Sequence, residues 1–367
     1  MRVLFNALQA GNRSGTGEYS YQCARWLPGL AGRDEIIVLW PKDVDPPEAL
    51  GHTDAVDLHD VSSPWRRVWL DQARVPELAR QYRAELVHYP ASIAGQWGRA
   101  RTIVTIHDLA FLRNPAWFRA DRAAFYRLTI GRSARRAARI IADSAATKTD
   151  LVEYLRIPEE RIDVVHLGVS EVFAPRSAEE QSSVKTRYGL PKPYFLYYGT
   201  LEPRKNLAQL IDAWSCVSGD ISEDLVIVGR RGWKTEEIDL AIQRCSHRAR
   251  IRMLGFVSQE DLPALISGAR ALVWPSLWEG FGLPPLESMA CGTPVLTSAV
   301  SSLPEICGDA ALLVDPTSVV EIADGISRLA SDDALCADLR GRGLARVQEY
   351  TWERTARGLL DSYRRAF

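Results

Sequence analysis

The chain has 367 residues, of which 46% are hydrophobic and 25% charged, and this size favours two α/β domains over a single hydrophobic core. A net charge of −1 provides no overall field for nucleic acid, and six cysteines without paired spacing predict a reduced, cytoplasmic protein without a zinc site. The sequence has no run of the ~20 apolar residues that cross a bilayer and no signal-peptide pattern at its start, so we expect neither a membrane span nor secretion.

Short apolar runs alternate with helical patterns along the chain, which is typical of parallel sheets covered by helices. Residues 168–193 are polar and irregular, and predict a linker with a short helix. We therefore predict two doubly wound domains, whose ligands bind beyond the carboxyl ends of the strands. The expected strands are 3–7, 35–39, 86–89, 102–105, 139–142 and 162–165 in the first half, and 194–198, 225–228, 251–254, 271–274, 295–297 and 311–314 in the second.

A glycine-rich turn follows the first predicted strand and contains Gly11, Gly15 and Gly17. Such a strand-to-helix turn lets the backbone approach a phosphate or an acceptor sugar, although a purely structural turn is the alternative. The turn lacks the third glycine of the dinucleotide fingerprint, which weakens a nicotinamide-dependent enzyme as an interpretation.

The motif Thr-Ile-His-Asp-Leu follows the fourth predicted strand and places His107 where an α/β domain presents functional side chains. His107 is either a functional group or a hydrogen-bonded structural histidine. Asp108 is expected to cap the loop or helix that follows.

Residues 117–139 carry seven arginines against one acidic residue, Asp121, with aromatic and aliphatic side chains at partly helical spacing. A basic amphipathic helix of this kind can lie on an anionic membrane, which would suit a lipid-linked acceptor. A solvated domain face is the alternative interpretation.

In the second half, the motif Gly-Thr-Leu-Glu-Pro-Arg-Lys-Asn begins at Gly199, follows a predicted strand and leads into a helix. Arg204 and Lys205 would give a diphosphate its counter-charge, Arg204 as a planar fork and Lys205 as a point charge. Two solvated cations on a domain face are the alternative.

The segment 276–294 sets Glu279 and Glu287 around the start of a helix. Proline is tolerated in the first helical turn, so the helix is predicted to begin at Pro284 and Pro285, with Glu287 in its first turn. The carboxylates would accept hydrogen bonds from sugar hydroxyls at the two ends of an extended ligand. A helix-start carboxylate favoured by the dipole and a solvated loop residue are the alternative.

Gly280 and Gly282 lie between these carboxylates and permit close approach of a ligand to the backbone. The free N–H groups and the positive dipole end of the following helix favour a phosphate oxygen. A diphosphate flanked by two hydroxyl-rich sugars fits this pattern.

From Glu279 to Val295, the pattern Glu-Gly-Phe-Gly-Leu-Pro-x-Leu-Glu-x-Met-Ala-x-Gly-x-Pro-Val resembles the signature of retaining glycosyltransferase family four, the group 1 glycosyltransferases. The resemblance spans nearly the whole chain and implies the GT-B fold, two Rossmann-like domains facing across a cleft. It implies an acceptor-side domain over 1–172, a donor-binding domain over 173–351, and a final helix, 352–367, that packs back on the first domain.

The resemblance also implies roles for individual residues. His107 would meet the transferred sugar near its anomeric end, Glu279 the hydroxyls of that sugar, and Glu287 the ribose. Thr200 stands where many members carry an arginine, so Lys205 is the firmer assignment and Arg204 the expected substitute. The other nucleotide-sugar-binding positions would be Gly15, Gly17, Gly199, Gly229, Val257, Gly280, Phe281, Gly282 and Leu283.

The implied activity is retaining transfer of a hexose from a nucleotide sugar to a glycan or lipid-linked acceptor. We expect front-face substitution, because neither Glu279 nor Glu287 is placed to attack the sugar from behind. We expect no metal or other cofactor, because no Asp-x-Asp motif or metal-ligand cluster is placed near the site. GDP-mannose is the expected donor, because the motif at 199–206 resembles that of polysaccharide mannosyltransferases. One alternative is a UDP-sugar enzyme that transfers glucose or rhamnose, hydrolyses or epimerises. The other is a nucleotide-binding protein without turnover.

Overall fold

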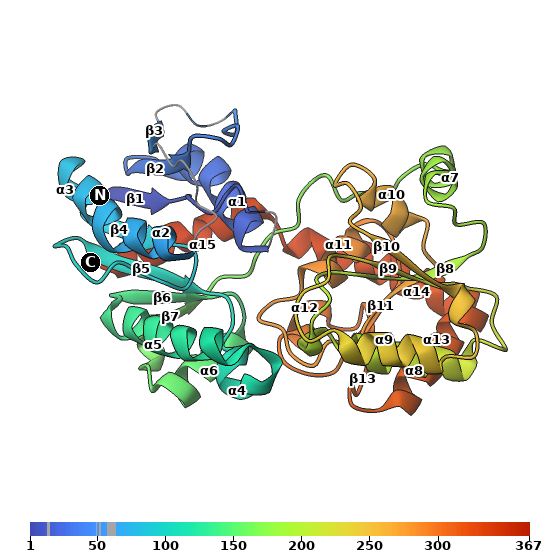
Figure 1. The fold of residues 1–367 in the computed structure, drawn as a ribbon. Helices are drawn as coiled ribbons and strands as arrows, with labels where there is room; N and C mark the ends of the chain where they lie inside the picture. The colour runs from blue at the N-terminus through green and yellow to red at the C-terminus, as the bar shows by residue number, and fades with distance from the viewer. Residues whose placement is uncertain (13–14, 49, 51–52, 57–63) are drawn as a thin grey trace. The chain divides into compact units, whose positions relative to one another are not determined.

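The computed structural model describes residues 1–12, 15–48, 50, 53–56 and 64–367, and it divides into two compact units (Figure 1). Unit 1 comprises Met1–Ala116, Ala120–Gly168 and Thr351–Phe367. Unit 2 comprises Trp117–Arg119 and Val169–Tyr350. Apart from the short segment Trp117–Arg119, the chain therefore leaves unit 1 after Gly168 and returns to it at Thr351.

In unit 1, the described strands form one parallel sheet in the order β3-β2-β1-β4-β5-β6-β7. The central strands read as continuous apolar runs because helices cover both faces of the sheet. The strand order reverses between β1 and β4, the point at which doubly wound sheets bind ligands. The strands are β1 (Arg2–Asn6), β2 (Glu35–Pro41), β3 (Thr53–Val56), β4 (Leu86–Tyr89), β5 (Arg101–Ile106), β6 (Arg139–Ala142) and β7 (Ile162–Val164).

The C-terminal helix α15 (Trp352–Arg365) packs against α1 (Gly15–Leu30) of unit 1, and Figure 1 shows it in red among the blue elements. Leu359 and Tyr363 of this helix are fully buried. Gly168 is required at the crossing, because a Cβ atom there would lie 2.2 Å from the backbone nitrogen of Trp352. The other helices of unit 1 are α2 (Pro64–Trp69), α3 (Val75–Gln81), α4 (Ala110–Arg113), α5 (Ala120–Arg136) and α6 (Ala145–Leu155).

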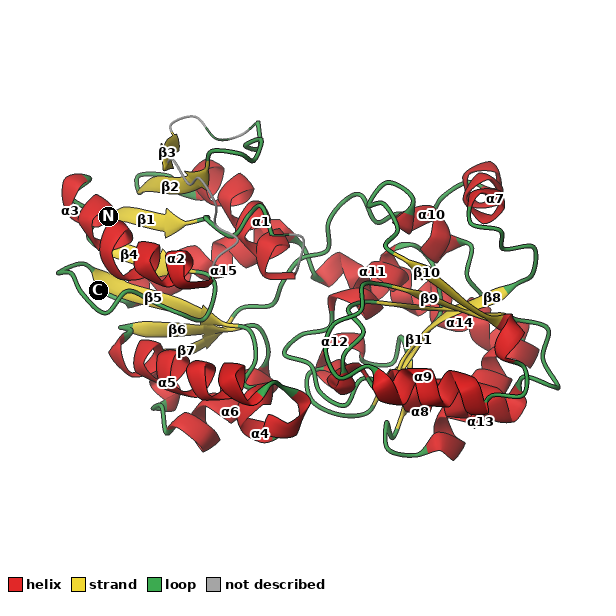
Figure 2. Cartoon of the chain, in the orientation of Figure 1, coloured by secondary structure: helices red, strands yellow, loops and turns green. Residues whose placement is uncertain are grey.

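In unit 2, the described strands form a second parallel sheet in the order β10-β9-β8-β11-β12-β13, which reverses between β8 and β11. Figure 2 shows α8, α9 and α13 on one side of this sheet and α10 and α11 on the other. The strands are β8 (Tyr194–Tyr198), β9 (Asp224–Val228), β10 (Ile251–Gly255), β11 (Ala271–Trp274), β12 (Val295–Ser298) and β13 (Leu312–Val314). The helices are α7 (Ala178–Arg187), α8 (Leu207–Val217), α9 (Glu236–Arg244), α10 (Leu262–Ser267), α11 (Leu283–Ala290), α12 (Leu303–Cys307), α13 (Val319–Ser331) and α14 (Asp333–Arg346).

The prediction of two doubly wound sheets is confirmed, and every predicted strand is present with ends shifted by no more than one or two residues. Strand β3 was not predicted; among the described strands it pairs with β2 alone, at the edge of the sheet. The predicted linker contains α7, whose first turn is closed by a capping box between Ser177 and Glu180.

Candidate functional site

The predicted donor-binding residues of unit 2 gather at the carboxyl edge of its sheet. Arg204 and Lys205 follow β8 in a single 3-10 turn (Pro203–Lys205), and Glu279 follows β11. Since β8 and β11 are neighbours where the strand order reverses, the topology joins Lys205 to Glu279 across 74 positions of sequence. This is the location at which doubly wound sheets bind ligands.

Two cations and two carboxylates form a buried charge cluster there: Glu202, Arg204, Lys205 and Glu279. Their side chains are only 8–13% exposed. Nζ of Lys205 donates to Oε1 of Glu279 at 2.6 Å, and the Arg204 guanidinium donates to Oε2 of Glu279 at 2.7 Å. Arg204 also donates to Oε1 of Glu202 at 2.9 Å. The charges of the cluster balance, as burial of ions requires.

Further contacts direct the Glu279 carboxylate toward the two cations. Ser276 donates to Oε1 of Glu279 at 2.5 Å, and the Glu279 backbone N–H donates to the Ser301 hydroxyl at 3.0 Å. Burial alone would raise the pKa of Glu279, but the charges of Arg204 and Lys205 outweigh it and hold that pKa below its ordinary value. Glu279 is therefore an ionised positioning group for Arg204 and Lys205, and no sugar hydroxyl is needed to satisfy its oxygens.

The turn that carries the cations is itself held from two sides. Asn206 has a left-handed backbone, with φ of 61°, and its side-chain amide donates to the carbonyls of Pro275 at 3.0 Å and Pro316 at 2.6 Å. The ammonium group of Lys205 lies 4.5 Å from the ring centre of Trp274, a cation–π contact. The positions of the cations thus depend on three separate segments of unit 2.

Glu287 lies in the second turn of α11, so its predicted place in the first turn is wrong. Gly282 precedes the helix with φ of +123°, a conformation that favours glycine, and Leu283 becomes the first helical residue. The Tyr198 hydroxyl lies 2.9 Å from Oε2 of Glu287 and 2.8 Å from the Pro284 carbonyl. Tyr198, at the end of β8, therefore holds Glu287 near the helix start.

Two predicted glycines of the site pack against each other where β8 and β9 end. Gly199 and Gly229 both have φ of +145°, and a Cβ atom on Gly229 would lie 1.8 Å from the Gly199 carbonyl oxygen. The Gly229 N–H donates to the Gly255 carbonyl at 2.7 Å. The next loop buries Val257. Gly229 is thus required by backbone packing, whatever ligand the edge binds.

In unit 1, His107 follows β5 and forms a partly buried pair with Asp143, with side chains 20% and 2% exposed. Its Nδ1 lies 2.6 Å from Oδ2 of Asp143, and its Nε2 lies 2.8 Å from the Pro90 carbonyl oxygen. Both ring nitrogens face oxygen acceptors, which a doubly protonated imidazolium satisfies. Burial lowers the pKa of His107, but the Asp143 charge and the hydrogen bonds outweigh it and the pKa is raised. The contacts to Asp143 and Pro90 therefore favour the protonated form of His107.

A buried chain of hydroxyl and imidazole groups lies beneath this pair. Nδ1 of His88 lies 2.6 Å from the Tyr363 hydroxyl, and Nε2 lies 2.8 Å from Oγ1 of Thr105. Oγ1 of Thr105 is in turn 2.9 Å from the Tyr19 hydroxyl. Burial lowers the pKa of His88 to about 3, so this imidazole is neutral. The chain connects β4 and β5 to both α1 and α15.

The glycine-rich turn of unit 1 lies partly outside the described residues, since 13–14 are not among them. Gly15 opens α1, and Gly17 lies in its first turn, where a Cβ atom would lie 1.7 Å from the Asn12 carbonyl oxygen. Asp108 accepts from the Ala110 N–H at 3.0 Å, as its predicted capping role requires.

Several residues of these clusters were not predicted from the sequence: Tyr198, Glu202, Asp143 and Ser276. Tyr198 is the last residue of β8, next to Gly199, and Glu202 lies in the motif that follows; this closeness to predicted residues was the only signal for them. Asp143 follows β6 just as His107 follows β5, and adjacent strands of one sheet bring them together.

Among the residues that the structure describes, no three His, Cys, Asp or Glu side chains are grouped so that they could hold a metal ion. In the same part of the chain, the longest apolar helices fall short of what is needed to span a membrane.

The chain is similar in sequence and in fold to known proteins. The family model described as Glycosyltransferase Family 4 matches residues 13–173, and that described as Glycosyl transferases group 1 matches residues 179–346. O-antigen chain mannosyltransferase B of Escherichia coli is 35% identical over 267 residues, which cover 72% of this chain and 70% of that protein. The serotype-specific mannosyltransferase WbdA of Escherichia coli is 30% identical over 285 residues, 76% of this chain but only 35% of the relative.

The fold also has solved counterparts. Sucrose-phosphate synthase from Thermosynechococcus elongatus superposes with a TM-score of 0.77 over 100% of this chain and 98% of that one, at 22% sequence identity. At that identity the likeness concerns the fold alone, and it confirms the predicted GT-B architecture.

Proposed function

The chain belongs to glycosyltransferase family 4, and from that premise we propose that it transfers a mannosyl group from GDP-mannose to a hydroxyl group of a glycan or glycolipid during polysaccharide assembly. The enzyme class follows from the family. The mannosyl group is supported by one observation, the 35% identity to O-antigen chain mannosyltransferase B over 72% of this chain.

We propose that the transfer retains the anomeric configuration by front-face substitution. The bond between C1 of the sugar and the phosphate oxygen breaks while the acceptor oxygen bonds to C1 on the same face, and the acceptor proton passes to the departing phosphate. The bonds from Arg204, Lys205 and Ser276 to Glu279 support this route, since a carboxylate held in this way is poorly suited to the covalent attack that retaining glycosidases use. Product with inverted configuration, seen in proton NMR couplings, would contradict it.

We propose that the departing diphosphate is neutralised by side chains and backbone without a metal. Arg204, Lys205, the Leu283 N–H and the positive dipole end of α11 favour a phosphate group at one edge of the sheet; Pro284 and Pro285 have no N–H to donate. The diphosphate oxygens would compete with the carboxylates of Glu202 and Glu279 for the N–H donors of Arg204 and Lys205. Turnover should therefore be unchanged by EDTA.

The decisive experiment offers the purified protein several nucleotide sugars with a mannose-terminated oligosaccharide acceptor, with and without EDTA, and follows products by mass spectrometry. Of the nucleotide sugars offered, we expect only GDP-mannose to increase the mass of the acceptor by one hexose. This product should be lost in the Lys205→Ala variant. Turnover with a UDP-sugar instead would overturn the donor assignment. Sugar release without acceptor would indicate a hydrolase, and nucleotide binding without turnover would indicate a binding protein.

We also propose that α5 contacts the inner face of an anionic membrane, which would bring the enzyme to a lipid-linked acceptor. Arg122, Arg127 and Arg132 are exposed on this helix, and none has an ion-pair partner among the described residues. Leu128, 55% exposed, adds an apolar side chain beside them. Arg139, which the predicted basic segment included, lies instead on β6 and pairs with Asp163 at 2.6 Å.

Co-sedimentation with phosphatidylglycerol vesicles tests this contact. We expect binding that weakens with salt and falls in the triple variant with glutamine at Arg122, Arg127 and Arg132. The matched control is Arg248→Gln, an exposed arginine of unit 2. Equal binding by the triple variant and the control would leave α5 as a solvated domain face.

A further inference from the structure

A pocket lies on the opposite edge of the unit 2 sheet from the donor residues. It has a volume of about 470 Å³ and lies between α7, the loop before β8, the loop before β11 and α14. Pro193 of the lining directly precedes β8 and Arg270 directly precedes β11, whereas Arg204 and Lys205 follow β8 and Glu279 follows β11. A strand of five residues spans about 16 Å at ~3.3 Å per residue, so the two sites are separate.

Four cationic side chains line this pocket: Lys185, Lys192, Arg270 and Arg340. Arg270 pairs with Asp333 at 2.6 Å, but Asp333 is 91% exposed and the pair is weak in water. In the described part of the chain, the other three cations have no ion-pair partner. The pocket therefore carries a clear excess of positive charge.

Backbone carbonyls hold the two arginines in place. Arg270 donates to the carbonyls of Leu329 at 2.7 Å and Ala330 at 3.2 Å, and Arg340 donates to that of Gly292 at 2.8 Å. Each guanidinium keeps further N–H donors beyond these bonds. The arginines are thus positioned before any ligand arrives, which lowers the entropy cost of binding.

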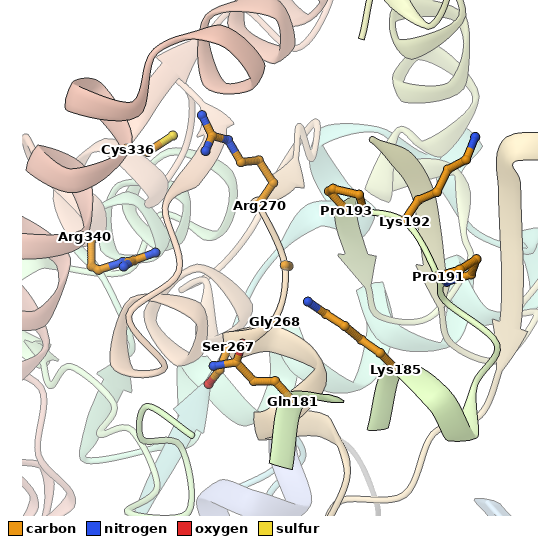
Figure 3. A pocket seen from close by; sticks show the side chains of 11 residues that line it. Gln181, Lys185, Pro191, Lys192, Pro193, Ser267, Gly268, Arg270, Cys336 and Arg340 are labelled. Carbon is orange, nitrogen blue, oxygen red and sulfur yellow. The ribbon is translucent and has the colours of Figure 1, made fainter. Parts of the chain in front are cut away.

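The side chains converge from different elements. In Figure 3, Lys185 on α7 and Arg340 on α14 extend toward each other from opposite sides, while Lys192 extends outward at the rim. Residue 268 is glycine, and a Cβ atom there would lie 3.0 Å from the Lys185 side chain, so the glycine leaves space for Lys185. Like charges converging in one concavity repel one another unless an anion joins them.

We propose that this pocket binds a phosphate monoester or diphosphate group. The arginine forks and the lysine ammonium groups match phosphate oxygens, and Gln181 and Ser267 on the wall add neutral polar groups. The volume exceeds that of a phosphate and leaves room for an attached organic group against Pro191 and Pro193. The ligand is either a soluble phosphate compound or the headgroup of a phospholipid.

Calorimetric titration with pyrophosphate tests the soluble source, and flotation with vesicles containing phosphatidic acid tests the lipid source. The test variant is Lys185→Gln/Arg340→Gln, with Arg248→Gln as the control for loss of a cation elsewhere on unit 2. We expect the double variant to weaken binding by at least about tenfold in one of the two arms, because each change removes a charge-assisted hydrogen bond.

Lys205→Ala separates this pocket from the donor site, where a diphosphate is also expected to bind. Binding that survives Lys205→Ala and is lost in the double variant supports the proposal. Binding lost only in Lys205→Ala, or no binding in either arm, overturns it. The single variant Lys185→Gln controls for misfolding of the double variant. The Lys185 ammonium makes only a weak contact with Tyr194, at 5.7 Å from the ring centre. We therefore expect the thermal midpoint of Lys185→Gln to equal that of the unaltered protein.

Discussion

At the scale of single residues, the balanced charges of Glu202, Arg204, Lys205 and Glu279 determine how the site meets an anionic donor. Lys205→Ala removes a cation, and we expect it to lower kcat by about a hundredfold, as loss of one preorganised electrostatic donor does. Glu202→Gln removes a carboxylate that competes for Arg204, and it should lower the donor KM. Steady-state kinetics with varied donor measures both.

The exposed carboxylate of Glu236, at the start of α9, provides the matched control for Glu202. Glu236→Gln makes the same change of charge away from the cluster and should leave KM unaltered. An unchanged kcat in Lys205→Ala, or a donor KM that rises in Glu202→Gln, would contradict the charge-balance argument.

The Asp143 carboxylate raises the pKa of the neighbouring His107. Asp143→Asn removes the negative charge that raises this pKa, so we expect the pKa to fall, as measured by NMR titration of the imidazole Cε1 proton. The stability that the protonated His107 contributes is complete below its unfolded-state pKa of about 6.5, and is lost as the pH rises through the folded-state value. An unchanged His107 titration in Asp143→Asn would show that another group sets the pKa.

At the scale of elements, the ends of β8 and β9 must approach each other backbone to backbone. Gly229→Ala would place a Cβ atom 1.8 Å from the Gly199 carbonyl, and we expect it to destabilise unit 2 by about 4 kcal/mol or more, at the upper end for point mutations. Gly255→Ala is the control. Its φ is +68°, but no atom lies within 4 Å of the added Cβ, so it should cost only about 1–2 kcal/mol.

Urea unfolding followed by tryptophan fluorescence compares the two variants, since Trp214 and Trp274 are buried in unit 2. Equal urea midpoints for Gly229→Ala and Gly255→Ala would mean that the ends of β8 and β9 can move apart without loss of stability.

At the scale of the whole molecule, unit 1 is completed by the last segment of the chain. Trp352, Leu359 and Tyr363 of α15 are buried, and Tyr363 also satisfies Nδ1 of the neutral His88. We expect a fragment of residues 1–168 to lack cooperative thermal unfolding, because it exposes this apolar surface and leaves a buried imidazole unpaired. Differential scanning calorimetry provides the measurement.

The matched control joins residues 351–367 to the N-terminal fragment through a flexible linker and restores α15. It should recover a single cooperative transition. A cooperative transition in the 1–168 fragment alone would show that α15 is dispensable for folding unit 1.

Much of the fold was predictable because its causes are local. Apolar runs buried on both faces marked the strands, and glycine and proline marked the approach to α11. The helix start was misplaced by one residue, since it depended on the conformation of Gly282, whose Cβ would lie 2.9 Å from Leu303. Edge strand β3 escaped prediction because a short strand at a sheet edge has no continuous apolar run.

The sequence by itself determined the two doubly wound domains, the family, and the edge of the sheet at which Arg204, Lys205, Glu279 and Glu287 lie, because motif order and strand polarity are properties of the chain. Only the tertiary structure decided the partners of these side chains. Glu279 holds the two cations because β11 lies beside β8, and Asp143 holds His107 because β6 lies beside β5. Hydrogen bonds at 2.6 Å depend on which strands are neighbours, and that adjacency is a property of the folded molecule.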